Sequence, residues 1–95
     1  MPHTIALVDD DRDEAVRAAR IADLSMQLDD TATAAAWFQR SDALRTGDAA
    51  LLARMADAQS RAGQVEPARA TIKRALEKDP AHPLANAVAR RLQAP

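Results

Sequence analysis

The strongest constraint on the fold of this chain is that two of its stretches repeat each other at a distance of 34 residues. Residues 19–23 read Ala-Arg-Ile-Ala-Asp, and residues 53–57 read Ala-Arg-Met-Ala-Asp. Three further pairs correspond at the same offset: Ala34 with Ala68, Arg40 with Arg74, and Phe38 with Ile72. A fixed period of about 20–50 residues indicates an architecture in which one small structural unit stacks on the next.

The composition indicates that this unit is helical. Alanine, the strongest helix former, supplies 24 of the 45 apolar residues in a chain of 95. Two Gly, one Phe, one Trp and no Tyr make the chain poor material for a sheet. We therefore expect an all-α domain in which small side chains pack closely. The absence of cysteine excludes a disulfide scaffold and thiol catalysis.

Helix-breaking residues divide the chain into five predicted helices. Apolar residues recur at intervals of three and four between Gly47, Gly63 and the Pro80–Pro83 region. The predicted helices cover residues 10–28, 31–44, 48–62, 65–78 and 83–92. Asp48 is expected to cap the third helix, and Gly63 is expected to end it in a left-handed conformation.

The second half of the chain carries a family pattern. Residues 49–82 place small side chains, a large apolar side chain and a terminating proline at these positions: Ala56, Ala68, Ile72 and Pro80. With this spacing the segment resembles the tetratricopeptide repeat family, although Gln59 stands where that family prefers Tyr. Residues 15–48 form a weaker copy. It keeps Ile21, Ala22, Ala34 and Phe38 but departs from the pattern at Ser25, Ser41 and Thr46.

The resemblance implies a fragment of an α-solenoid, built from antiparallel helical hairpins with about five helices. It divides the chain into an N-terminal tail, residues 1–9, and a tetratricopeptide-like domain, residues 10–95. The domain would hold two repeats and a capping helix: residues 15–48, 49–82 and 83–95. Two repeats are few for a stable stack, so we expect the capping helix, a second copy or a bound partner to supply the missing contact.

In this family the first helix of each hairpin lines a concave groove that binds peptides. The resemblance therefore implies an interaction module without enzymatic activity, an adaptor whose partner is a protein or peptide. Eight residues would face the groove: Arg20, Asp23, Met26 and Gln27, then Arg54, Asp57, Ser60 and Arg61. The alternative for the charged residues is that Arg20 pairs with Asp23, and Arg54 with Asp57, because residues three apart are neighbours on a helix.

Trp37 is a ninth candidate for partner contact. It precedes Phe38, and two adjacent residues of a helix do not face the same core. The 34-residue offset assigns Phe38 to the interior, so we expect Trp37 to be at least partly exposed. Exposed tryptophan is typical of interfaces. Cover by the N-terminal tail is the alternative.

The net charge of −1 conceals an uneven distribution. Residues 1–48 carry ten acidic and five basic residues, giving −5, whereas residues 49–95 carry four and eight, giving +4. Opposite ends of this kind attract head to tail, with a strength that falls as salt rises. A self-assembling homo-oligomer is therefore an alternative function. Basic residues of the fourth helix alternate with acidic ones, so no nucleic-acid partner is predicted.

The opening of the chain supports a third function class. Residues 4–11 read Thr-Ile-Ala-Leu-Val-Asp-Asp-Asp and resemble the first strand of response-regulator receiver domains, which would make the chain a phosphorelay accessory domain. A receiver also needs an acceptor Asp after a second strand, and residues 51–55 lack one. The simpler interpretation is a disordered tail, or one that docks on a repeat helix of this chain or of a second copy. The acidic residues that follow would then stabilise the start of the first helix.

Catalytic and metal-binding patterns are not found in the sequence. His3 and His82 have no third ligand, the serines have no base nearby in sequence, and there is no glycine-rich phosphate loop. We therefore predict no enzymatic activity, no metal and no cofactor. With no apolar run of about 18 residues and no basic-then-apolar leader, we expect a cytoplasmic protein without a membrane partner.

Overall fold

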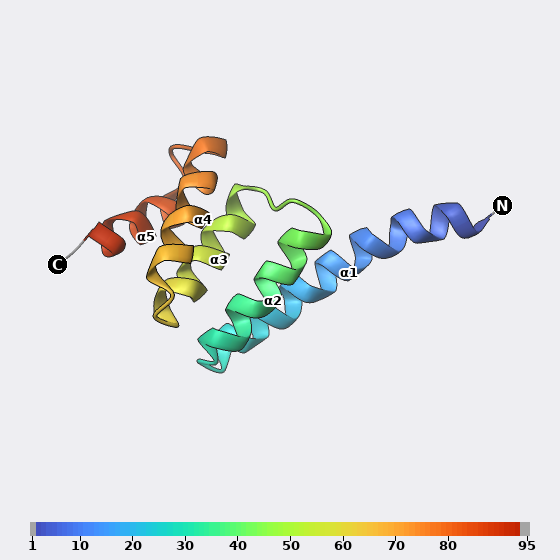
Figure 1. Ribbon diagram of the computed structural model, residues 1–95, viewed down its shortest axis with the longest axis horizontal. Coiled ribbons are helices and arrows are strands. Elements are labelled where there is room, and N and C mark those ends of the chain that lie inside the picture. Colours follow the sequence, from blue (N-terminus) through green and yellow to red (C-terminus); the bar gives the residue numbers. More distant parts are fainter. Residues whose placement is uncertain (1, 94–95) are drawn as a thin grey trace.

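The computed structural model describes the backbone of residues 2–93 and the side chains of residues 11–93. Every regular element in this part of the chain is a helix, which confirms the all-α prediction. The helices are α1 (Pro2–Gln27), α2 (Thr31–Leu44), α3 (Ala49–Arg61), α4 (Val65–Lys78) and α5 (Pro83–Gln93). Figure 1 shows α1 and α2 as one antiparallel hairpin and α3 and α4 as a second, with α5 stacked at the far end.

The predicted limits of four helices agree with the structure to within about a residue. Asp48 caps α3 as expected, because its Oδ1 accepts a hydrogen bond of 2.8 Å from the backbone N–H of Leu51. Gly63 follows α3 with a φ of 81°, a left-handed conformation that costs glycine little. A side chain there would be strained by the backbone alone, since no atom lies within 4 Å of the position of its Cβ.

The first helix differs from its prediction, because it begins at Pro2 and not near residue 10. Residues 4–11 are therefore helical, which contradicts both a receiver-domain strand and a disordered tail at these residues. The acidic residues from Asp9 to Glu14 lie inside α1, so they do not stabilise its first turn. Figure 1 shows this end of α1 extending away from the other helices, and the backbone of residues 2–9 does not fold back on them. The division into residues 1–9 and 10–95 remains a prediction.

Small residues lie where the helices cross. Ala22, Ala34, Ala56 and Ala68, which occupy the corresponding small positions of the two hairpins, are all fully buried. An alanine at a crossing lets two helix axes approach closely, so the stack gains contact without large side chains. Part of the alanine excess of the sequence is therefore used for packing between helices.

Larger side chains fill the space beside the crossings. Phe38, Leu52 and Val88 are the largest fully buried side chains, and Ile72 is 8% exposed, so the predicted inward orientation of Phe38 and Ile72 is confirmed. Val88 belongs to α5, which packs on both α3 and α4.

Two serines that depart from the family pattern are buried, and both find partners. Ser41 Oγ donates a hydrogen bond of 2.7 Å to the carbonyl of Ala15, which joins α2 to α1. Ser25 Oγ donates to the carbonyl of Ile21 one turn earlier, at 2.9 Å. Gln59 is also buried, and its Oε1 has no hydrogen-bond partner among the described residues. The hydroxyl groups are thus compatible with the core because helix carbonyls accept from them.

One carboxylate fixes the two hairpins relative to each other. Asp42 on α2 accepts two hydrogen bonds from the Arg74 guanidinium on α4, at 2.8 and 2.9 Å, and a third from the backbone N–H of Gly47 at 2.9 Å. The Arg74 hydrogen bonds are the main cause of a lowered pKa at Asp42, and burial opposes them. The second helices of successive hairpins are therefore joined by a bidentate ion pair.

Candidate functional site

The nine residues predicted to contact a partner come from three helices. Four lie on α1, four on α3, and Trp37 on α2. The structure separates them into a cleft, an ion-pair cluster beside α5, and three residues that join neither group.

Arg20, Asp23 and Arg54 line a cleft between α1 and α3, with a volume of about 490 Å³. The cleft exists because α1 packs along α2, and α2 along α3, while α1 and α3 make few direct contacts. Its apolar surface comes from both helices: Ala15, Val16, Ala19 and Leu51. The segment 45–48, which joins the two hairpins, closes one side. Three of the residues predicted to face a groove therefore line one depression between the first helices of the two hairpins.

An ion pair crosses this cleft. Arg54 Nη1 lies 2.5 Å from Asp23 Oδ2, and the guanidinium also lies over the Phe38 ring, 5.6 Å from its centroid. The expected pairing within each helix is therefore wrong for Arg54, because Asp23 on the neighbouring hairpin is within reach and Asp57 has other partners. Arg54 is held in place by both contacts.

The cleft is positively charged. Arg12 and Arg45 line it in addition to Arg20 and Arg54, whereas its acidic residues are Asp23 and Asp48. Both carboxylates are engaged, Asp23 by Arg54 and Asp48 by the α3 cap. Among the described side chains, the other three arginines form no ion pair, and all three are exposed.

Sequence reasoning missed two of these arginines. Arg12 lies eight residues before Arg20, a helical interval that places both on one face, so the signal was present in the sequence. Arg45 lies between α2 and α3, and no periodicity links it to the cleft. Only the turn of the chain through residues 45–48 brings it there.

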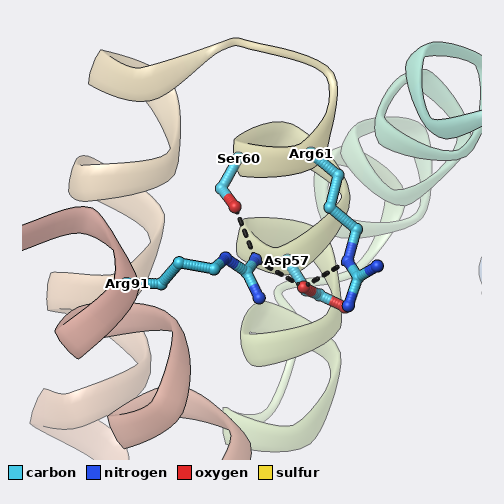
Figure 2. Close-up of polar contacts among 4 residues, drawn as sticks. All are labelled: Asp57, Ser60, Arg61 and Arg91. Atoms are coloured by element: carbon cyan, nitrogen blue, oxygen red, sulfur yellow. Dashed lines mark hydrogen bonds and ion pairs between the residues drawn. The ribbon is translucent and has the colours of Figure 1, made fainter. Parts of the chain in front are cut away.

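Asp57, Ser60 and Arg61 form the second group, together with a residue that was not predicted. Asp57 Oδ1 accepts from Arg61 Nε at 2.9 Å and from Arg91 Nη2 on α5 at 2.6 Å. Figure 2 shows these contacts as dashed lines. Arg91 Nη2 also donates to Ser60 Oγ at 2.5 Å. The contact with Asp57 raises the pKa of Arg61. Asp57 and Ser60 thus hold α5 against α3 through Arg91, and Arg61 pairs with Asp57 within α3.

The two groups share one arrangement. Asp23 and Asp57 lie 34 residues apart. Asp23 on α1 accepts from Arg54 on α3, and Asp57 on α3 accepts from Arg91 on α5. These two ion pairs, which we call the ladder, therefore link α1 to α3 and α3 to α5. Arg20 stands outside this ladder.

Met26, Gln27 and Trp37 do not belong to either group. Met26 is half-buried against the core, and Gln27 is exposed at the end of α1. Trp37 is half-buried, which agrees with the expected partial exposure. It lines a shallow depression of about 370 Å³ with α1 residues that include Ile21, itself 38% exposed.

Among the described residues, no group of three or more His, Cys, Asp or Glu side chains could hold a metal ion. Among these helices, none combines the length and the apolar character that crossing a membrane requires.

The sequence was also compared with known proteins. The pattern of one protein family, described as Tetratricopeptide repeat, matches residues 25–92, which is well over half of the chain. No curated protein matches it.

Proposed function

The chain belongs to the tetratricopeptide repeat family, and from that premise we propose that it binds, without catalysis, a peptide segment that carries an acidic residue beside an apolar one. Members of this family are generally modules of protein–protein interaction. The proposed site is the cleft between α1 and α3, and the arginines that surround its apolar surface carry the proposal.

The charges of the cleft favour an acidic partner. Arg12, Arg20 and Arg45 are exposed around it, and its two carboxylates are engaged by groups of the protein itself. An arginine presents a planar fork of N–H donors that fits the two oxygens of a carboxylate. A peptide carboxylate entering the cleft would therefore meet donors and no free acidic group among the described side chains.

The surface between the arginines favours an apolar neighbour to that carboxylate. Val16 is 48% exposed, and it adjoins the alanine side chains of α1 and Leu51 of α3. Covering this surface removes apolar area from water, which is the usual source of affinity in a concave site. Arg54 contributes mainly by shape, since Asp23 and the Phe38 ring fix its side chain.

Arg20 and Arg45 line the cleft and form no ion pair with a described side chain, so their substitution tests peptide binding. A random peptide library is selected against the full chain, and the dissociation constant of the best peptides is measured for wild type and for Arg20→Glu with Arg45→Glu. We expect the selected peptides to be enriched in Asp or Glu next to an apolar residue. We expect the double variant to bind at least about tenfold more weakly, and wild-type affinity to fall as salt rises.

Arg90→Glu is the matched control, because Arg90 is exposed on α5 and does not line the cleft. It changes the net charge in the same direction and should leave affinity within about twofold. Selected peptides without acidic residues, or equal affinity for the double variant, would show that the cleft is not the site.

A further inference from the structure

A second depression lies at the opposite end of the molecule, between α4 and α5. We call it the C-terminal slot; its volume is about 520 Å³, and its surface is mostly apolar. Ile72 and Leu76 line it from α4, and Ala89 and Leu92 from α5. In each of the two hairpins the first helix packs against an antiparallel partner, α1 against α2 and α3 against α4. By contrast, no helix among residues 2–93 covers the slot between α4 and α5. The slot therefore leaves an apolar surface of α4 and α5 uncovered by the described helices.

At the other end of the molecule, the N-terminal part of α1 extends beyond its partner helix α2. The Ser41–Ala15 hydrogen bond fixes the register of the first hairpin, and α2 ends three residues later at Leu44. Since the two helices are antiparallel, residues 2–11 of α1, which we call the N-terminal segment, extend beyond α2 (Figure 1). Ten helical residues are about 15 Å long, close to the length of the 11-residue α5.

The two ends have complementary chemistry. The N-terminal segment contains Ile5, Leu7 and Val8, followed by Asp9–Asp11. Arg69, Lys73 and Glu77 border the slot, and all three are exposed. Arg69 pairs with Glu66, so Lys73 is the basic residue of the slot that has no ion-pair partner among the described side chains. This local difference follows the charge of the chain, which is −5 over residues 1–48 and +4 over residues 49–95.

We propose that the N-terminal segment of one copy packs as a helix into the C-terminal slot of a second copy. Its apolar residues cover the slot, and its aspartates lie near Arg69 and Lys73. The contact joins two different surfaces, so a pair of copies still presents one free slot and one free segment. Copies therefore add head to tail. The peptide cleft shares no lining residue with the slot.

Sedimentation equilibrium of the full chain tests the assembly directly. We expect an average mass above that of one copy at low salt, rising with concentration, and a fall towards one copy at high salt because the charges are screened. A single-copy mass at both salts, up to about millimolar concentration, would overturn the proposal.

Two variants each disable one side of the contact. Deletion of residues 1–8 removes the apolar part of the segment, and Lys73→Glu reverses a charge at the slot; Lys73 is exposed and forms no ion pair with a described side chain. Each variant alone should associate at least about tenfold more weakly than wild type. Circular dichroism melts establish that both variants are folded.

Mixing the two variants gives the decisive result. The deleted copy keeps an intact slot and the Lys73→Glu copy keeps an intact segment, so the mixture should form a dimer of one copy of each and no larger species. A mixture that stays monomeric, or a deletion variant that associates as wild type does, contradicts a head-to-tail contact. The Arg20→Glu, Arg45→Glu variant should assemble normally, which separates this outcome from failure of the peptide cleft.

Discussion

Asp42 joins the second helices of the two hairpins to each other. Its carboxylate accepts from Arg74 on α4 and from the Gly47 backbone, and only 15% of its side chain is exposed. The Asp42 side chain thus joins α2 to the loop at Gly47 and to α4. No other described carboxylate joins the second helices of the two hairpins.

Stability should depend on pH through this residue. Arg74 holds the pKa of Asp42 below its ordinary value of 3.8, so the unfolded chain takes up the proton at a higher pH than the folded one does. The resulting stabilisation is complete above the unfolded pKa and is lost as pH falls through the folded pKa. Urea denaturation should therefore show a falling free energy of unfolding below about pH 4. Asp42→Asn should reduce that free energy by about 1–2 kcal/mol near pH 7 and flatten its acid dependence.

Glu66→Gln is the control for this change. Glu66 also pairs with an arginine, Arg69 at 3.0 Å, but its side chain is 81% exposed. Its replacement should alter the free energy of unfolding by less than about 0.5 kcal/mol. Equal effects of the two substitutions would mean that burial and bidentate geometry at Asp42 contribute nothing.

The packing of the helices depends on how closely their axes can approach each other. Ala56 on α3 and Ala22 on α1 occupy corresponding crossings, 34 residues apart, and neither is exposed. Interiors of this density do not accommodate added volume without displacement of a neighbouring helix.

Enlarging one crossing tests this directly. Ala56→Leu should lower the free energy of unfolding by about 1–3 kcal/mol, since it forces α3 away from its neighbours. Ala70→Leu adds the same atoms to the exposed side of α4 and should change it by less than about 0.5 kcal/mol. Denaturant titrations of both variants provide the comparison. A neutral Ala56→Leu would show that the crossing has spare room.

The sequence predicted the elements better than their contacts. Breakers and caps such as Gly63 and Asp48 act locally, so the limits of four helices followed from them. The start of α1 was not predicted correctly, because an apolar stretch followed by acidic residues is equally typical of a strand or a tail. The Asp23–Arg54 pair was missed for a different reason. Its residues are 31 apart, and only the stacking of the hairpins brings them together.

At the scale of the whole molecule, α5 completes the second hairpin. Val88 and Ala85 are fully buried, and Arg91 ties the helix to Asp57 and Ser60. A stack of only two hairpins has few interfaces, so each one accounts for a large share of the total stability.

Truncation after residue 82 should therefore destabilise the chain strongly. Burial of Val88 alone is worth about 1.5–3 kcal/mol, which corresponds to a fall of about 10 °C or more in the melting temperature of a domain of this size. Arg91→Ala, which removes a half-exposed charge contact and leaves the apolar face of α5, should lower it by only a few degrees. Calorimetry or circular dichroism measures both. A truncated chain that melts like wild type would show that α5 is dispensable.

The projecting end of α1 also determines how the molecule moves through water. The chain measures 56 × 28 × 19 Å, and its radius of gyration of 14.1 Å exceeds the value of about 12 Å typical of a compact domain of this length. Such a rod has a larger frictional coefficient than a sphere of equal mass. A single copy should elute early from a sizing column, and removal of residues 1–8 should delay elution even with no change in association. Elution volume thus follows friction, whereas sedimentation equilibrium follows mass alone.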